Sequence, residues 1–192
     1  MQERSTARIE KVLEATESLL ESMGPEKTSI PAIAIAADVP RAAIYPFFED
    51  KYAIFSHLAV LHMSRLTDAI RASGADQAVD WQSWVEKVID SVTAYYNDKP
   101  VASILLLRGC FTQLDQKKHS AKNLTIGELL RAKAAESDRT LAWPTEPDVA
   151  SIAVELAFAC MKYGYTHDGC ISDNVAYEAK RSVLAYLKEW SL

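Results

Sequence analysis

The residues best suited to recognising another molecule lie at positions 38–48, which read DVPRAAIYPFF. Arg41 is followed there by two small residues, Ala42 and Ala43. A guanidinium group can form paired hydrogen bonds with guanine O6 and N7 or with phosphate oxygens. Two alanines would let a helix backbone approach such a partner closely, and the Ala43 methyl could touch a thymine methyl. The alternative interpretation is that PRAAIY only starts a surface helix whose arginine is solvated.

A short helix is predicted just before this segment. Residues 28–37 read TSIPAIAIAA, and Ser29 is a residue type that favours the N-cap position. Pro31 falls in the first turn, where a helix has no use for the missing N–H. We expect this helix to end near Ala37.

A second short helix should follow after a three-residue turn. Asp38 tolerates left-handed backbone geometry better than most residues, and Pro40 can open a helix over residues 41–47. Two short helices joined in this way form a helix-turn-helix, whose second helix enters the major groove of DNA by its N-terminal residues. Arg41 is then a candidate to read a base edge or to hold a phosphate.

The rest of the chain is also predicted to be helical. Apolar residues recur at spacings of three and four over residues 6–23, until Gly24-Pro25 ends the pattern. Further helices are expected over residues 50–74, 81–96, 100–114, part of 116–139, 147–167 and 172–190. Thr145 or Glu146 should lie near the start of the 147–167 helix, and Ser172 should cap the last one.

The overall charge is unusual for a protein that binds nucleic acid. The chain has a formal net charge of −5, and residues 1–51 carry six Lys or Arg against nine Asp or Glu. A domain that binds nucleic acid is usually basic. Any such binding must therefore depend on local placement of a few cations. The candidates are Arg4, Arg8, Lys27, Arg41 and Lys51.

Cysteine content and hydropathy restrict the class further. Cys110, Cys160 and Cys170 are an odd set with no CxxC spacing, which argues against a disulfide framework and against a thiolate zinc site. The apolar runs are short and interrupted by charge. We expect a cytoplasmic protein with no membrane segment, no metal ion and no cofactor.

An enzyme is the less favoured alternative. The sequence contains no GxGxxG, GxxxxGK[ST] or HExxH motif and no nucleophile-elbow serine, and no histidine follows a glutamate by three residues. His167-Asp168 is an adjacent pair of the kind found in helical phosphohydrolases, but it lacks partners at helical spacing. A helical sensor that acts through a protein partner without binding DNA is a further alternative.

Residues 8–55 resemble the DNA-binding domain of the TetR family of bacterial repressors. The resemblance is carried, in order, by the amphipathic first helix, TSIPAIA, ADVPRAAIYPFF and DKYAIF. It implies an all-α fold of about nine helices, with an N-terminal three-helix helix-turn-helix domain over residues 1–51. Residues 52–192 would form a C-terminal helical bundle for ligand binding and dimerisation, entered through a connecting helix from about residue 50.

The resemblance also implies contacts with the DNA backbone. Thr28 and Ser29 stand where the family caps its second helix and touches a phosphate. Tyr45 matches a tyrosine that usually bonds the backbone. Lys51 matches a lysine at the start of the fourth helix, a favourable place to hold a phosphate.

Base reading is implied for the start of the recognition helix. The base-facing set consists of Arg41, Ala42 and Ala43. Pro40 and Phe47, which belong to the predicted contact set, stand where family members usually have serine and histidine, and Asp38 stands where they have glycine. Pro46 should end the recognition helix early.

The family's mechanism implies a ligand-responsive repressor. A small molecule bound in the C-terminal bundle would shift the connecting helix and change the separation of two recognition helices, which must lie about 34 Å apart on a palindromic operator in double-stranded DNA. The helices over residues 147–167 and 172–190 would pack on their twins to form the homodimer.

Aromatic side chains suggest where the effector would bind. The candidate pocket residues are Trp84, Tyr96, Arg108, Phe111, Phe158 and Tyr163. Aromatic walls suit an apolar or aromatic molecule, with an acid group if Arg108 faces inward. Arg108 could equally snorkel or pair with an acid on a neighbouring helix, and the aromatic residues could be ordinary core.

Overall fold

The computed structural model describes residues 2–108, 113–139 and 141–191, with the backbone course alone for residues 2–4 and 113–122. These residues contain helices and no β-strand, which confirms the predicted all-α class. The α-helices are α1 (Gln2–Lys27), α2 (Ile30–Ala36), α3 (Lys51–Ala72), α4 (Trp81–Asp98), α5 (Pro100–Leu106), α6 (Gln113–Ser137), α7 (Val149–Asp168) and α8 (Asp173–Lys188), with 3-10 helices η1 (Arg41–Ala43) and η2 (Ala75–Gln77).

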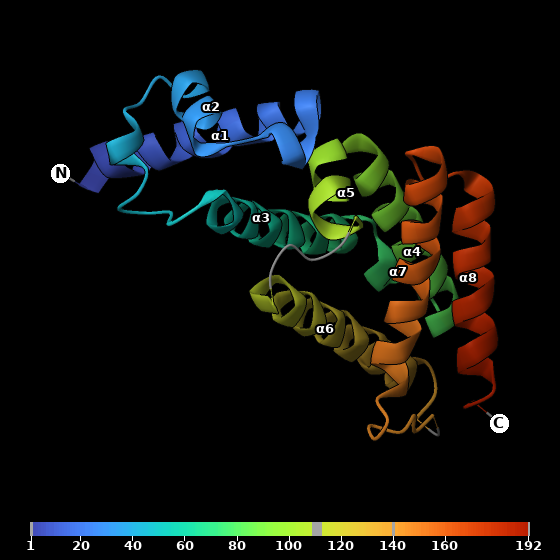
Figure 1. Cartoon of the computed structure of the whole chain (residues 1–192). Helices are drawn as coiled ribbons and strands as arrows, with labels where there is room; N and C mark the ends of the chain where they lie inside the picture. The colour runs from blue at the N-terminus through green and yellow to red at the C-terminus, as the bar shows by residue number, and fades with distance from the viewer. Residues whose placement is uncertain (1, 109–112, 140, 192) are drawn as a thin grey trace.

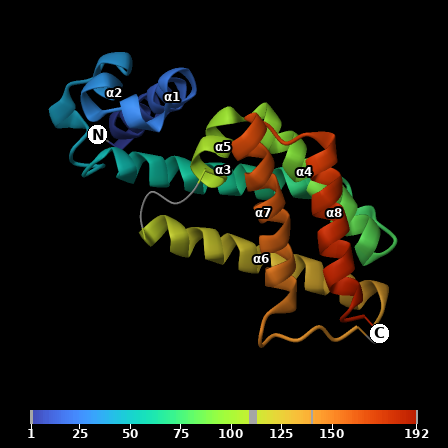
Figure 2. The same ribbon diagram turned by 45° about the vertical axis from the view of Figure 1, so that its right-hand side comes forward.

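The helices form two groups joined by α3. Figure 1 shows α1 and α2 together at the N-terminal end, while α7 and α8 lie side by side at the opposite end. The turned view in Figure 2 keeps this arrangement, with α3 running from the first group into the second. None of the helices in the described residues is long and apolar enough to cross a membrane.

Most predicted helix starts are confirmed by their caps. The side chains of Asp50, Asp80 and Ser172 each accept a backbone N–H at the starts of α3, α4 and α8. The predicted start of α7, with Thr145 or Glu146 near the cap, was wrong. The helix begins at Val149 and its cap is Asp148. The Asp148 carboxylate accepts the Ser151 N–H, which would otherwise be unpaired, and its negative charge is favourable at the positive end of the helix dipole.

Two segments in the middle of the chain differ from the sequence prediction. The helix expected over residues 100–114 ends as α5 at Leu106, so Arg108 lies beyond it. The polar stretch expected to contain a loop and then a helix is helical from Gln113 to Ser137. Polar residues gave no apolar period there, which is why the start of α6 was missed.

The predicted helix-turn-helix is present, with one change. Ser29 caps α2 by accepting the Ala32 N–H, and Asp38 has the left-handed φ of 52° that its residue type suggested. The recognition segment, however, is the 3-10 helix η1 and a turn, where an α-helix over residues 41–47 was expected. Pro46 has no N–H to donate to the carbonyl four residues earlier, so an α-helical ladder cannot form across it.

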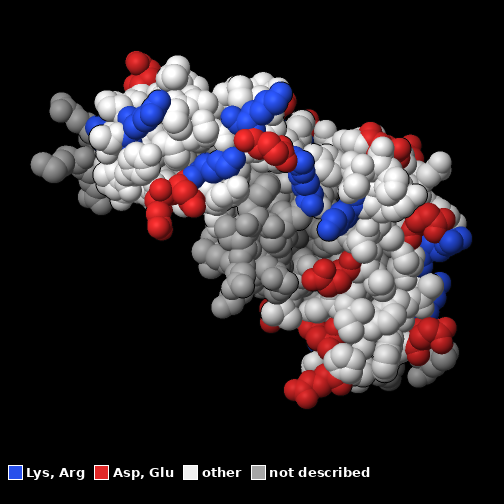
Figure 3. All heavy atoms as spheres, viewed as in Figure 1, with Lys and Arg blue, Asp and Glu red and all other residues white. Residues whose placement is uncertain are grey.

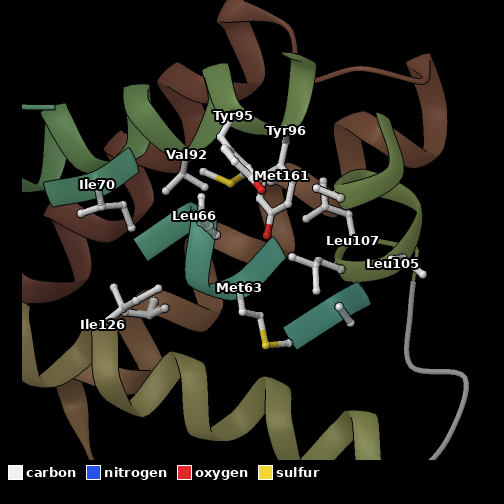
Figure 4. Packing of buried hydrophobic residues seen from close by; sticks show 14 of the residues in the cluster. Met63, Leu66, Ile70, Val92, Tyr95, Tyr96, Leu105, Leu107, Ile126 and Met161 are labelled. Carbon is white, nitrogen blue, oxygen red and sulfur yellow. The ribbon is translucent and has the colours of Figure 1, made fainter. Parts of the chain in front are cut away.

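The larger helices share one apolar core. Figure 4 shows Tyr95 and Tyr96 of α4 extending among Met63 and Leu66 of α3, Leu105 of α5 and Met161 of α7. Tyr96 is 1% exposed, and Phe55, Leu58 and Leu66 are similarly buried along α3. Because α3 contributes to this core and also contacts α1, its position is set by both groups of helices.

Lys51 ties the start of α3 to the turn before α2, which follows a kink in α1 at the non-helical Gly24. Its Nζ donates to the carbonyl oxygens of Pro25 at 2.8 Å, Thr28 at 3.0 Å and Glu26 at 3.4 Å. The ammonium also lies 5.3 Å from the centre of the Tyr52 ring. A lysine has three N–H donors, so these carbonyls engage its whole hydrogen-bonding capacity.

A buried polar contact joins α1, α3 and α4. His62 is 2% exposed, and its Nδ1 lies 2.9 Å from the Tyr95 hydroxyl. Its Nε2 lies 3.1 Å from Glu17 Oε1, close enough for an ion pair although the geometry falls short of a hydrogen bond. Burial lowers the pKa of His62, and the Glu17 carboxylate opposes that shift while Arg65 and Lys99 add to it. Burial also raises the pKa of Tyr95 to about 12.

The first prediction concerns Lys51 as a structural tie. Lys51→Met should lower the free energy of unfolding by about 2 kcal/mol, because three carbonyl oxygens lose a charged donor. Urea unfolding followed by circular dichroism measures this change. Lys27→Met, at an exposed lysine on the same turn, should leave the midpoint unchanged. Equal midpoints for the two variants would show that Lys51 contributes nothing to the fold.

The second prediction follows from the lowered pKa of His62. The unfolded chain takes up a proton on this residue at a higher pH than the folded chain does, so stability should fall as the pH drops below about 6.5. Urea unfolding at several pH values measures the slope. His62→Gln should flatten it, whereas His167→Gln, at an exposed histidine, should preserve it. An unchanged slope in His62→Gln would contradict the assignment.

Candidate nucleic-acid interface and ligand cavity

The segment after α2 presents one side to the protein and the other to solvent. Ile44 and Phe48 are 1% and 6% exposed and pack into the core beside α2 and α3. Arg41, Ala42 and Tyr45 point outward from the same segment and are exposed. The buried pair therefore holds η1 against the domain while the outward residues remain accessible to a partner.

The structure brings most of the predicted contact set together. Pro40, Arg41, Ala42, Tyr45 and Phe47 are all exposed on the segment that follows α2. Ala43 is only half-buried and lies between them in the sequence, at the end of η1. One short stretch thus carries a guanidinium group, a phenol and several apolar surfaces.

Thr28 and Lys51, which were assigned as phosphate contacts, both have hydrogen-bond partners within the protein. Thr28 is 0% exposed, and its hydroxyl donates to the Gly24 carbonyl at 2.8 Å. Lys51 is occupied by the three carbonyls described above. Ser29 is partly exposed while its oxygen accepts the Ala32 N–H at 3.4 Å. Thr28 and Lys51 thus stabilise the segment before α2, where several carbonyl oxygens lack helical partners.

The outward surface of the helix-turn-helix has little charge. Arg41 is the only Lys or Arg between residues 28 and 50, and it makes no ion pair with any described residue. A surface hollow beside it also contains the acidic Asp38. Figure 3 shows the N-terminal end of the molecule as largely uncharged, with separated Lys or Arg and Asp or Glu groups. Among nearby residues of α1, Arg8 and Lys11 are exposed.

The exposed apolar side chain at Ile35 is not predicted by the sequence. This residue of α2 is 79% exposed and lines the hollow next to Pro40 and Arg41. The run IPAIAIAA is apolar throughout, so its sequence cannot tell which side faces water. Burial of Ile33 and Ala34 in the core, seen only in the structure, places Ile35 on the outside.

An apolar cavity lies within the C-terminal group of helices. It measures about 40 Å³ and is lined by residues of α4, α6, α7 and α8. The lining residues are Trp84, Val85, Val88, Ile89, Val92, Ile126, Leu130, Ala153, Val154, Ala157, Phe158, Met161 and Val183. These side chains are apolar apart from the indole N–H group of Trp84, so the cavity suits a hydrocarbon or aromatic group.

Two of the six predicted pocket residues line this cavity. Trp84 and Phe158 do so, whereas Tyr96 is packed edge-on against Phe158 with ring centres 6.1 Å apart. Burial raises the pKa of Tyr96, and its hydroxyl has no hydrogen-bond partner among the described residues. Tyr96 is therefore part of the wall behind the cavity, and it remains protonated.

Neither Arg108 nor Tyr163 lines this cavity. Arg108 lies outside the cavity and forms an ion pair with Glu26 of α1, with Nη2 and Oε1 2.6 Å apart. Tyr163 is 60% exposed and stacks on His167 with ring centres 4.1 Å apart. Phe111 lies outside the described residues. Arg108 follows the C-cap of α5, Leu107, and its side chain reaches Glu26 of α1.

The described residues show no arrangement that would hold a metal ion. No group of three or more His, Cys, Asp or Glu side chains converges among them. The adjacent His167 and Asp168 are both exposed at the end of α7, where the histidine Nδ1 contacts the Tyr163 carbonyl. The geometry there is that of a helix end.

Comparison with known proteins relates both parts of the chain to one class of regulator. Residues 12–58 match the family model described as "Bacterial regulatory proteins, tetR family". No curated protein matches the chain in sequence. The match to the family model covers most of α1, the helix-turn-helix and the first part of α3.

Solved structures extend the likeness to the whole fold. A TetR-family transcriptional regulator from Streptomyces coelicolor shares 22% identity over 95% of this chain and 98% of its own, with a TM-score of 0.74. A TetR-like transcriptional regulator from Rhodococcus sp. RHA1 shares 17% identity over 94% and 96%, with a TM-score of 0.67. The fatty acid degradation regulator FadR from Bacillus halodurans shares 18% identity over 94% of both chains, with a TM-score of 0.66.

At these identities the solved structures establish the fold of the chain. The match to the family model identifies the N-terminal domain as a tetR-family domain. Proteins of the tetR family are DNA-binding transcriptional regulators. The helix-turn-helix of this chain is that of the tetR family of bacterial regulatory proteins, and the described chain as a whole has the fold of TetR-family transcriptional regulators.

Proposed function

We propose that this protein is a homodimeric transcriptional repressor that leaves its operator when a small apolar effector binds. The observation that carries the proposal is the outward face of Arg41, Ala42 and Tyr45, fixed by the buried side chains of Ile44 and Phe48. A guanidinium group at the start of such a segment can reach the base edges in a major groove.

Two functional parts follow from this proposal. Residues 1–51 form the DNA-binding part, and residues 52–192 form the part that binds the effector and dimerises. The helix α3 starts at Lys51 and belongs to both, since its first residue holds the turn before α2 and its middle residues pack on α4. Movement of α3 would therefore reposition the recognition segment.

The proposed dimer uses the outward faces of α7 and α8. Ala159 and Tyr163 of α7 are exposed, and Cys160 Sγ lies 3.5 Å from Ser182 Oγ where the two helices meet. These small and aromatic side chains leave a surface on which a second copy can pack as a four-helix bundle. A dimer would place two recognition segments on successive major grooves of a palindromic site.

The proposed effector is apolar and enters between α4, α6, α7 and α8. The cavity there is about 40 Å³, whereas pockets for molecules of drug size measure about 300–1,000 Å³. Binding would therefore require these helices to separate, and α4 would carry the displacement to α3. Because Arg108 lies outside the cavity, an acid group on the effector finds no arginine partner there.

One observation favours a second function. Among residues 28–50, all of them described, Arg41 is the single Lys or Arg, which is few for a surface that must approach phosphates. A helical sensor that acts through a protein partner would need no such charge. Direct measurement of DNA binding separates the two functions.

The third prediction tests DNA binding through Arg41. In a gel-shift assay with the DNA that flanks its own gene, the protein should form a complex that Arg41→Ala weakens by about 1–3 kcal/mol. Arg71→Ala, at an exposed arginine near the end of α3, should bind as the unchanged protein does. Absence of a complex at low salt would refute the repressor and favour the partner-dependent sensor.

The fourth prediction tests the dimer surface. Ala159→Glu places a charge on the exposed side of α7 and should give monomers in light scattering, with helical content retained. Ala72→Glu, at an exposed alanine of α3, should remain dimeric. Ala179 is unsuitable for this test, because it is 0% exposed within one protomer and a charge there would disrupt the fold. A dimeric Ala159→Glu would place the interface elsewhere.

A further inference from the structure

The outward side of the recognition segment is mainly apolar. Tyr45 and Phe47 are 55% and 42% exposed, and both are large side chains that usually lie inside a protein. Ala42 and the rings of Pro40 and Pro46 are exposed on the same short segment. These exposed apolar side chains lie with Arg41 on the segment where the proposed function requires contact with DNA.

Few hydrogen-bond donors are available on this side. Thr28 and Lys51 are engaged within the protein, and Ser29 caps α2. Within residues 38–48 the polar side chains are those of Asp38, Arg41 and Tyr45. A carboxylate repels phosphates, so the guanidinium and the phenol are the groups that could donate to DNA.

An apolar surface can still distinguish base pairs in the major groove. Thymine alone presents a methyl group there, whereas guanine and cytosine present strong acceptors and a donor. A methyl group packed against an alanine or an aromatic ring is removed from water with a gain in free energy. A guanine or cytosine edge in the same place would lose its hydrogen bonds to water without replacement.

We propose that Ala42 and Tyr45 read the 5-methyl groups of thymines in the operator half-site, so that sequence preference depends on apolar contact more than on hydrogen bonding. Ala42 and Tyr45 are three residues apart on the exposed side of the segment, opposite the buried Ile44 and Phe48. Arg41 adds one hydrogen-bonded contact beside them. The inference depends on the proposed DNA binding and specifies its chemistry.

The test uses a duplex selected from a randomised pool with the full-length protein. Each thymine of one half-site is replaced in turn by deoxyuridine, which removes only the methyl group. Affinity should fall about fourfold for each methyl that is read, the value of one buried CH₂ group. Replacing such a thymine by cytosine should weaken binding further, and 5-methylcytosine should recover about fourfold of that loss.

Protein variants assign the effect to residues. In Ala42→Gly or Tyr45→Ser, deoxyuridine at the position read by that residue should no longer change the affinity. Arg41→Ala and Val79→Ala should retain the full deoxyuridine effect, since Val79 is 87% exposed between η2 and α4, outside the helix-turn-helix. Testing both Ala42→Gly and Tyr45→Ser guards against a fold defect in either one, and circular dichroism checks each.

Each outcome is decisive. Loss of affinity at one or two thymines, abolished in Ala42→Gly or Tyr45→Ser, supports methyl reading. A selected duplex whose thymines can all be replaced by deoxyuridine without effect overturns it and leaves DNA binding intact. Failure to select any duplex refutes the proposed function itself, and the apolar surface would then fit a protein partner.

Discussion

The three hydrogen bonds of Lys51 are the contact on which the arrangement of the molecule depends. One ammonium group gathers the carbonyl oxygens at the turn before α2 and fixes them to the first residue of α3. Those carbonyls belong to a turn that contains Gly24, with φ of 77°, and Pro25, and the turn cannot satisfy them by helical pairing. Whatever moves the start of α3 therefore also moves the helix-turn-helix.

Further contacts make this coupling stiffer. Glu17 approaches both His62 and Arg65 of α3, and Glu26 pairs with Arg108 beyond α5. The Glu26–Arg108 pair is exposed and contributes little free energy, whereas the His62 contact is buried and carries a larger desolvation cost. Because the buried contact reaches Tyr95 of α4, it also links α1 to a helix that encloses the apolar cavity.

The outward side of the helix-turn-helix has few charged side chains. A protein with few cations gains little non-specific affinity from phosphates, so the proposed function would need dimerisation to join two weak half-site contacts. The outward side chains of the recognition segment provide apolar area instead. Under the proposed function, this combination would let a chain with a net charge of −5 bind DNA.

The sequence alone determined the all-α class, the caps at Ser29 and Ser172, the starts of the helices at residues 50 and 81, and the left-handed turn at Asp38, because each depends on local backbone chemistry or on periodicity. It also located the outward Arg41–Tyr45 segment. Only the tertiary structure decided that Thr28 and Lys51 face inward, that Arg108 turns toward α1 and that the cavity is small and apolar. Those outcomes depend on which carbonyls, carboxylates and rings of distant segments meet, and a side chain's type and local spacing do not specify its partners in space.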